Sequence, residues 1–311
     1  MVVVAVAGGT GSVGRTLVDA LKESKEHQVI VLGRKIPAGG ESGVQVFAVD
    51  YSDVAGLTKT LEENNVHTVI SAMVMYDAAA AQAEVNLVAA AAKSSCTVRF
   101  VASNWGLASP EDESLRIPHN AFREHSIETL RKTDLEWTQV HNSYFLDYFG
   151  MPHVETYLSP LVFAIDIANR KAVMPGTTGD EIITFTYTKD MAKFVVAALD
   201  LPKWDEVMHC YSDNATLKEV LQIAEEMTGS KFSVTYDPVE KLQRGEVTEL
   251  PSHKDLYDYF PRPILEGMLA IFGLWTVNGL MELRKEGSLN EKFPDIKTVS
   301  VRDILGVWKG K

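Results

Sequence analysis

The chain has 311 residues, of which 46% are hydrophobic and 23% charged, a composition typical of globular proteins with one or two domains. A formal net charge of -12 argues against nucleic acid or an anionic membrane surface as a partner. Cys96 and Cys210 offer neither a disulfide framework nor metal-ligand spacing, which favours a reducing, cytoplasmic compartment and predicts no bound metal.

The chain begins with an apolar run that leads into regularly spaced glycines, MVVVAVAGGTGSVG. Residues 2–7 are apolar on both faces, which predicts a buried strand of a parallel sheet. Gly8, Gly11 and Gly14 follow, and an amphipathic helix pattern comes next. This order is typical of a dinucleotide-binding fingerprint, in which the backbone approaches a pyrophosphate at the helix N-terminus. The predicted cofactor-binding residues of the turn are Gly8, Thr10, Gly11, Ser12, Val13 and Gly14.

Strand and helix patterns alternate through the first half of the chain. Further strands are predicted at 28–32, 44–49, 68–72, 98–102 and 137–141, and further helices at 54–64, 78–93 and 121–131. Such alternation predicts an α/β fold, a doubly wound parallel sheet of the Rossmann type with helices on both faces. Ligands of this fold bind beyond the carboxyl ends of the strands, so the residues just after each strand are candidates for the site.

The residues after the second strand favour NADP(H) as the cofactor. Arg34 and Lys35 stand where an acid would bind the ribose hydroxyls of NAD, and two cations suit a 2′-phosphate. A solvated basic pair is the alternative interpretation. Asp50, after the third strand, is a candidate adenine contact. The candidate cofactor-binding residues after the later strands are Ala72, Met73, Ser103, Asn104, Asn142 and Tyr144.

The second half of the chain is less regular. Strands are predicted at 182–188 and 232–236, and helices at 189–199 and 217–227. We expect residues 1–150 to form an NADP-binding domain, with returning elements near 180–205, and residues 151–311 to form mainly a smaller substrate-binding lobe. The longest apolar stretch, 263–281, contains Glu266 and is expected to form a helix pair over the substrate cleft rather than a membrane span.

Several of these segments resemble the NmrA-like and isoflavone-reductase-like group of atypical short-chain dehydrogenases. The resemblance is carried by residues 4–14, Arg34, residues 99–106, residues 135–140, Asn142, Phe145 and residues 187–199. It implies a Rossmann domain, bound NADP and a small C-terminal substrate lobe. It is specific for the family and says little about the reaction.

The chain departs from this family at the expected catalytic positions. Reductases of the group usually carry a lysine on the helix after the fifth strand, and Arg123 stands at that position. Where the wider superfamily has Tyr-x-x-x-Lys, this chain has His119-x-x-x-Arg123. An arginine can hold the nicotinamide ribose but does not release a proton at ordinary pH, whereas a histidine titrates near neutrality. We therefore expect Arg123 to bind the ribose and His119 to donate the proton; an exposed histidine beside a proline is the alternative for His119.

Three functions remain open at this point. The first is an NADPH-dependent oxidoreductase that reduces a small aromatic or alkaloid-like metabolite, and the predicted substrate contacts are Trp105, Phe122, Tyr144 and Phe145. The second is a non-redox cyclase or condensation enzyme that retains NADP(H) and acts through an iminium ion. The third is a regulatory protein that senses NADP. The sequence leaves the choice between monomer and dimer open.

Overall fold

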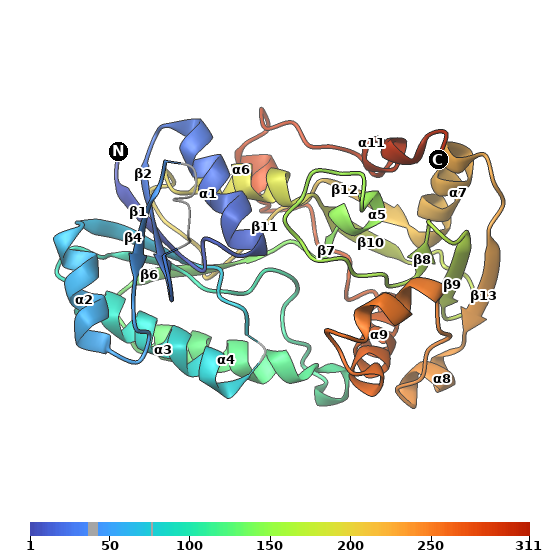
Figure 1. Ribbon diagram of the computed structural model, residues 1–311, viewed down its shortest axis with the longest axis horizontal. Helices are drawn as coiled ribbons and strands as arrows, with labels where there is room; N and C mark the ends of the chain where they lie inside the picture. Colours follow the sequence, from blue (N-terminus) through green and yellow to red (C-terminus); the bar gives the residue numbers. More distant parts are fainter. Residues whose placement is uncertain (37–42, 76) are drawn as a thin grey trace.

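The computed structural model describes residues 1–36, 43–75 and 77–311, and its centre is a seven-stranded parallel sheet (Figure 1). The strand order is β11-β6-β5-β4-β1-β2-β3. The strands are β1 (Val3–Ala7), β2 (Gln28–Gly33), β3 (Gln45–Ala48), β4 (Val66–Ser71), β5 (Arg99–Val101), β6 (Glu136–His141) and β11 (Val207–His209). The chain moves outward from β1 in one direction and then, from β4, in the other. The predicted doubly wound α/β fold is confirmed, and its ligand crevice lies where the order reverses.

Helices cover both faces of this sheet (Figure 1). One face carries α1 (Ser12–Ser24) and α6 (Thr188–Ala198), and the other carries α2 (Val54–Glu63), α3 (Ala78–Lys93) and α4 (Pro118–Leu130). The side chains of β1 alternate between the two resulting cores: Val4 and Val6 pack with α1 and α6, whereas Ala5 and Ala7 pack with the other three helices. This two-sided burial explains why β1 has no polar face.

Local capping explains where two of these helices begin. The Asp77 side chain accepts a hydrogen bond from the Ala80 N–H (2.7 Å), and a run of good helix formers follows. Helix α4 begins at Pro118, three residues earlier than predicted, because proline suits the first helical position and Asn120 Oδ1 accepts the Ile117 N–H (2.8 Å). His119 consequently lies within the first turn of α4.

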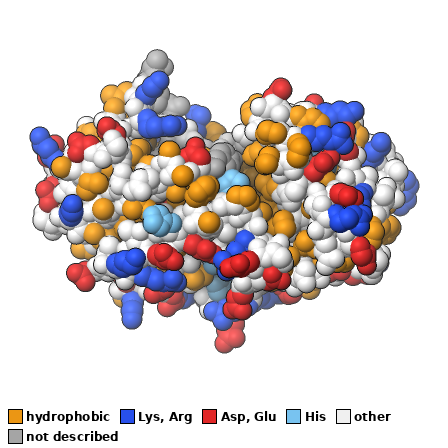
Figure 2. All heavy atoms as spheres, turned by 90° about the horizontal axis from the view of Figure 1, so that it is seen from below, with side chains coloured by type: hydrophobic (Ala, Val, Ile, Leu, Met, Phe, Trp, Pro, Cys, Tyr) orange, Lys and Arg blue, Asp and Glu red, His pale blue; other side chains and the backbone are white. Residues whose placement is uncertain are grey.

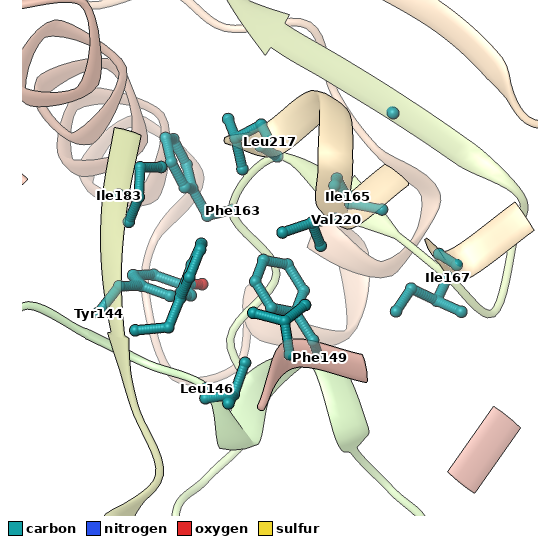
Figure 3. Packing of buried hydrophobic residues seen from close by; sticks show 14 of the residues in the cluster. Tyr144, Leu146, Phe149, Phe163, Ile165, Ile167, Ile183, Leu217 and Val220 are labelled. Carbon is teal, nitrogen blue, oxygen red and sulfur yellow. The ribbon is translucent and has the colours of Figure 1, made fainter. Parts of the chain in front are cut away.

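The second half of the chain builds two three-stranded sheets, with the orders β12-β10-β7 and β13-β9-β8. Their strands are β7 (Tyr144–Phe145), β8 (Ile165–Asp166), β9 (Lys171–Pro175), β10 (Ile182–Thr186), β12 (Asp213–Thr216) and β13 (Ser233–Asp237). The helices around them are α5 (Asp147–Gly150), α7 (Leu217–Thr228), α8 (Val239–Gln243), α9 (Arg262–Val277), α10 (Leu289–Lys292) and α11 (Val301–Leu305). A core rich in aromatic residues joins most of these elements, with Tyr144, Phe149 and Phe163 at its centre (Figure 3).

Two further differences from the sequence-based expectations concern a strand and a helix. Strand β11 was missed because its three residues are too short for a recognisable pattern. The helix pair expected at 263–281 is wrong: this stretch is one helix, α9, which ends at Val277 and is followed by Gly279 in a left-handed conformation (φ 69°). None of the helices described here has the length and apolar character needed to cross a membrane.

Candidate active site

A cavity of about 330 Å³ opens at the carboxyl ends of β1, β4, β5 and β6. The far side of the cavity is formed by residues 158–161 and by α9 from the second half of the chain. Figure 2 shows the molecule hollowed between its two halves, with hydrophobic side chains gathered on the wall of this hollow. The cavity thus lies where parallel α/β sheets bind their ligands.

The glycine turn brings the N-terminus of α1 to the edge of this cavity. Gly8 has a φ of 75°, and a Cβ atom at this position would lie 2.7 Å from the Ala72 carbonyl oxygen. Gly11 caps α1 without a side-chain hydrogen bond, and a Cβ there would meet only the Gly8 carbonyl oxygen, at 3.3 Å. Ser12 and Val13, the first residues of α1, line the cavity. The turn therefore fits a pyrophosphate, which needs exposed N–H groups and room for close approach.

Six of the other predicted cofactor contacts line the cavity or are exposed. Ala72, Met73 and Ser103 line the cavity. Arg34 and Lys35 are exposed after β2, and Thr10 is exposed in the glycine turn. These positions are accessible to a ligand that extends from the cavity along the carboxyl ends of β1 and β2.

Three predicted cofactor contacts are engaged in local hydrogen bonds. The Asp50 carboxylate accepts the N–H and hydroxyl of Ser52 (2.8 and 2.7 Å), and these bonds lower its pKa. Asn104 is buried and donates to Gln139 Oε1 (2.5 Å), and Asn142 is buried with its Nδ2 3.4 Å from the Ser143 carbonyl oxygen. Neither asparagine is among the described residues that line the cavity. The Asn104 bond joins the segment after β5 to β6.

His119 and Arg123 both line the cavity, one turn apart on the same face of α4. The Arg123 guanidinium packs beside Gly106, where a Cβ atom would lie 3.8 Å from Nη1. Burial lowers the pKa of His119 below its ordinary value, and the positive charge of Arg123 lowers it further. The structure therefore brings together the two residues expected to carry the chemistry, with His119 mainly neutral at pH 7.

Three of the four predicted substrate contacts line the cavity: Trp105, Tyr144 and Phe145. The Trp105 indole N–H donates to the Ser71 carbonyl oxygen (3.1 Å), which fixes the ring. The Tyr144 hydroxyl finds no hydrogen-bond partner among the described residues and lies in the aromatic core, where burial raises its pKa (Figure 3). Phe122 is half-buried on α4 and is not among the described lining residues.

The side chains that α9 contributes to the site were not predicted from the sequence. Met268, Phe272 and Trp275 line the cavity from one face of this helix. The rings of Phe272 and Trp275 stack with their centroids 5.1 Å apart, and the Trp275 indole N–H donates to the Leu115 carbonyl oxygen (2.7 Å). The apolar stretch that contains them was expected to cover the cleft, and α9 does cover the cavity. Which of its residues face inward depends on the helix register.

Comparisons with known proteins identify the family. The model of the NmrA-like family matches residues 2–284, which is most of the chain. The chain belongs to the NmrA-like family. Two fungal relatives are both named oxidoreductases. Oxidoreductase BOA1 of Botryotinia fuckeliana is 37% identical over 301 residues, covering 95% of this chain and 96% of the relative. Oxidoreductase swnN of Metarhizium robertsii is 32% identical over 338 residues, covering 98% of this chain and 96% of the relative. The predicted family and enzyme class, an oxidoreductase, are confirmed.

Solved structures share the fold of this NmrA-like protein. One, titled AtPrR2 with NADP+ and (+)pinoresinol, has a TM-score of 0.74 at 21% identity and covers 99% of this chain and 98% of its own. Another, the ternary complex of leucoanthocyanidin reductase from Vitis vinifera, has a TM-score of 0.73 at 14% identity and covers 98% of both chains. The arrangement of the main sheet and the second half is therefore shared with reductases of quite different sequence.

Proposed function

We propose that this NmrA-like protein is an NADPH-dependent reductase of a small, largely apolar metabolite. One observation carries the proposal: the open N-terminus of α1, Arg123 and His119 all face the same apolar cavity. The names of the fungal relatives and the NADP(H) in the titles of similar structures support the same conclusion.

Each group of residues has a distinct task in this proposal. The N–H groups at the start of α1 hold the pyrophosphate, and Arg34 and Lys35 hold the 2′-phosphate. Arg123 holds the nicotinamide ribose through its fixed guanidinium donors. When bound, the nicotinamide supplies a hydride. His119 delivers the proton to the substrate oxygen or nitrogen, and the α9 wall keeps water away from the reacting atoms.

The lining of the cavity indicates which substrates fit. Among the described lining residues, Arg123 and His119 are the ionisable groups other than tyrosine, and no carboxylate is present. Aliphatic, aromatic and methionine side chains make up most of the other described lining residues. An uncharged substrate with flat rings and one reducible C=O or C=N bond suits such a surface.

The arginine at the usual lysine position also supports a second candidate, a non-redox cyclase or condensation enzyme that retains NADP(H). Arginine holds a ribose but gives up no proton, so the site lacks one proton-transfer group of the reductases. The test is to incubate the protein with NADPH and a set of uncharged aromatic ketones, enones and imines. Nicotinamide absorbance and product formation are then followed together. A reductase oxidises NADPH in step with product, a non-redox enzyme forms product without oxidation, and a sensor does neither.

A further inference from the structure

His27 is a buried histidine at the amino ends of the parallel strands, the edge of the main sheet opposite the cavity. It immediately precedes β2, and its side chain is only 3% exposed. Neither of its ring nitrogens has a hydrogen-bond partner among the described residues. Buried polar side chains are nearly always partnered, so an imidazole with two buried, unpartnered nitrogens indicates a binding role.

Two exposed carboxylates lie beside this imidazole. Glu26 precedes it in the chain, and Asp200 comes from the segment after α6. One oxygen of each carboxylate and a ring nitrogen of His27 all lie within 4.8 Å of one another. The distance from His27 Nε2 to Asp200 Oδ1 is 3.7 Å, which is too long for a hydrogen bond. Two ligands of one tetrahedral zinc ion, each about 2.1 Å from the metal, lie about 3.4 Å apart. Small rotations of the two exposed side chains therefore bring all three groups to coordination distance.

The backbone that carries Asp200 is held in place. The Arg99 guanidinium donates to the Leu199 carbonyl oxygen (2.7 Å) and the Leu201 carbonyl oxygen (2.8 Å), on either side of Asp200 in the chain. The charge of Arg99 is itself paired with the Glu136 carboxylate. Helices α1 and α6, which precede the two segments of the cluster, pack against each other (Figure 1). The buried ring and the Asp200 backbone are thus fixed before any ion binds.

The donor set indicates which ion fits. Imidazole nitrogen is a good ligand for Zn²⁺ and similar transition-metal ions, whereas Mg²⁺ and Ca²⁺ prefer oxygen ligands alone. The two carboxylates offset the charge of a divalent cation. Three protein ligands leave the fourth position of a tetrahedral ion to water, as the exposure of both carboxylates allows.

We propose that Glu26, His27 and Asp200 form a binding site for a zinc-type divalent ion, which clamps the connection between α1 and β2 to the segment after α6. No bound metal was expected from the sequence, because Asp200 lies far from the other two ligands in the chain and no ligand spacing is visible. The site lies at the opposite edge of the sheet from the cavity, so the proposal does not rest on the proposed function.

The direct test is calorimetric titration of the untagged, metal-free protein with ZnCl₂, and in parallel with MgCl₂. We expect one Zn²⁺ per chain and no binding of Mg²⁺ at the same concentrations. His27→Gln should weaken Zn²⁺ binding about tenfold or more, since losing even a partner of a metal ligand costs that much. His125→Gln, at an exposed position of α4, is the matched control and should bind Zn²⁺ as the wild type does. Equal Zn²⁺ binding by His27→Gln and wild type would mean adventitious surface binding and overturn the proposal.

A second variant decides the question if His27→Gln does not fold. Asp200→Asn changes a side chain that is 64% exposed, so the fold should tolerate it. It should weaken Zn²⁺ binding about tenfold or more. Asp205→Asn makes the same change at another exposed aspartate of this segment and should have no effect. An affinity of Asp200→Asn equal to that of the wild type also overturns the proposal.

Thermal unfolding tests the clamp itself. An ion that binds only the folded chain stabilises it, so ZnCl₂ at a hundred times its dissociation constant should raise the thermal midpoint of the wild type by about 5 °C. The midpoint of Asp200→Asn should not rise. Zn²⁺ binding without a rise in the wild type would contradict a clamp. None of these measurements uses NADPH or a substrate, so a failure of the proposed function leaves their outcome unchanged.

Discussion

Gly14 packs so closely against Gly8 that a Cβ atom at Gly14 would lie 2.2 Å from the Gly8 carbonyl oxygen. Gly11 differs, because its Cβ would lie 3.3 Å from the same oxygen and meet nothing else within 4 Å. Gly14 is thus required for packing α1 on β1, whereas the space beside Gly11 is available to a ligand.

The two glycines should therefore respond differently to substitution. Gly11→Val should fold and abolish NADPH binding, because the side chain fills the space for the pyrophosphate. Gly14→Ala should lower the thermal midpoint, since backbone must move to make room. Calorimetric titration with NADPH and thermal unfolding of both variants test this. Normal NADPH binding by Gly11→Val would place the cofactor elsewhere.

Arg34 should decide the preference between NADP(H) and NAD(H). Arg34→Ala should weaken NADPH binding by about tenfold and leave NADH binding unchanged. A tenfold loss corresponds to the lower end of the free energy of a charge-assisted hydrogen bond, because Arg34 is exposed. Lys59→Ala, an equal charge change on the exposed side of α2, is the matched control. Equal affinities of wild type for the two cofactors would remove the basis for NADP(H).

His119 should control the pH dependence of turnover. Because burial and Arg123 lower its pKa below 6.5, only a minor fraction carries the donated proton at pH 7, so kcat should rise as pH falls through that pKa. His119→Ala should remove this rise and lower kcat about 100- to 10,000-fold, with NADPH affinity nearly unchanged. His125→Ala, exposed on the same helix, serves as control. A wild-type pH profile in His119→Ala would show that another group or water supplies the proton.

His141 should make the fold sensitive to acid. Burial lowers its pKa from 6.5 to about 4, with smaller contributions from His209 and Arg123. Between these values the unfolded chain binds a proton that the folded chain does not, so the free energy of unfolding falls as pH falls. Between pH 7 and pH 5, His141 should account for a fall of about 2 kcal/mol in the free energy of unfolding of the wild type. This part of the fall should be absent in His141→Gln when stability is measured by urea unfolding at both pH values. The control variant His125→Gln should lose as much stability between pH 7 and pH 5 as the wild type. If His141→Gln also loses as much as the wild type, His141 is not the source of the acid sensitivity.

The parts of the fold that are set by local sequence were predictable. Helix α3 occupies the predicted residues 78–93 because an alanine-rich run follows the Asp77 cap. Six apolar runs indicated six of the seven strands of the main sheet. The seventh strand, β11, pairs with β6 over only three residues, and this pairing depends on the position of β6 rather than on the sequence of β11.

The candidate site was predictable only in part, for physical reasons. His119 and Arg123 were found through their spacing, which places both on one helix face. Glu84 on α3 accepts the Ser103 N–H (2.8 Å) behind the cavity and was not singled out, although an acid on the apolar face of an alanine-rich helix was a usable signal. The hydrogen bond from the Trp275 indole N–H to the Leu115 carbonyl oxygen joins two residues far apart in the chain. No local sequence pattern indicates such a pairing.

In the function proposed above, this protein transfers hydride from NADPH to an apolar substrate bound beneath α9. The most direct test uses NADPH deuterated at the transferable position of the nicotinamide, with the set of uncharged ketones, enones and imines, and mass analysis of the product. We expect one deuterium in each product molecule and an equal amount of NADP+ formed. Product without deuterium, with the NADPH unchanged, would contradict it.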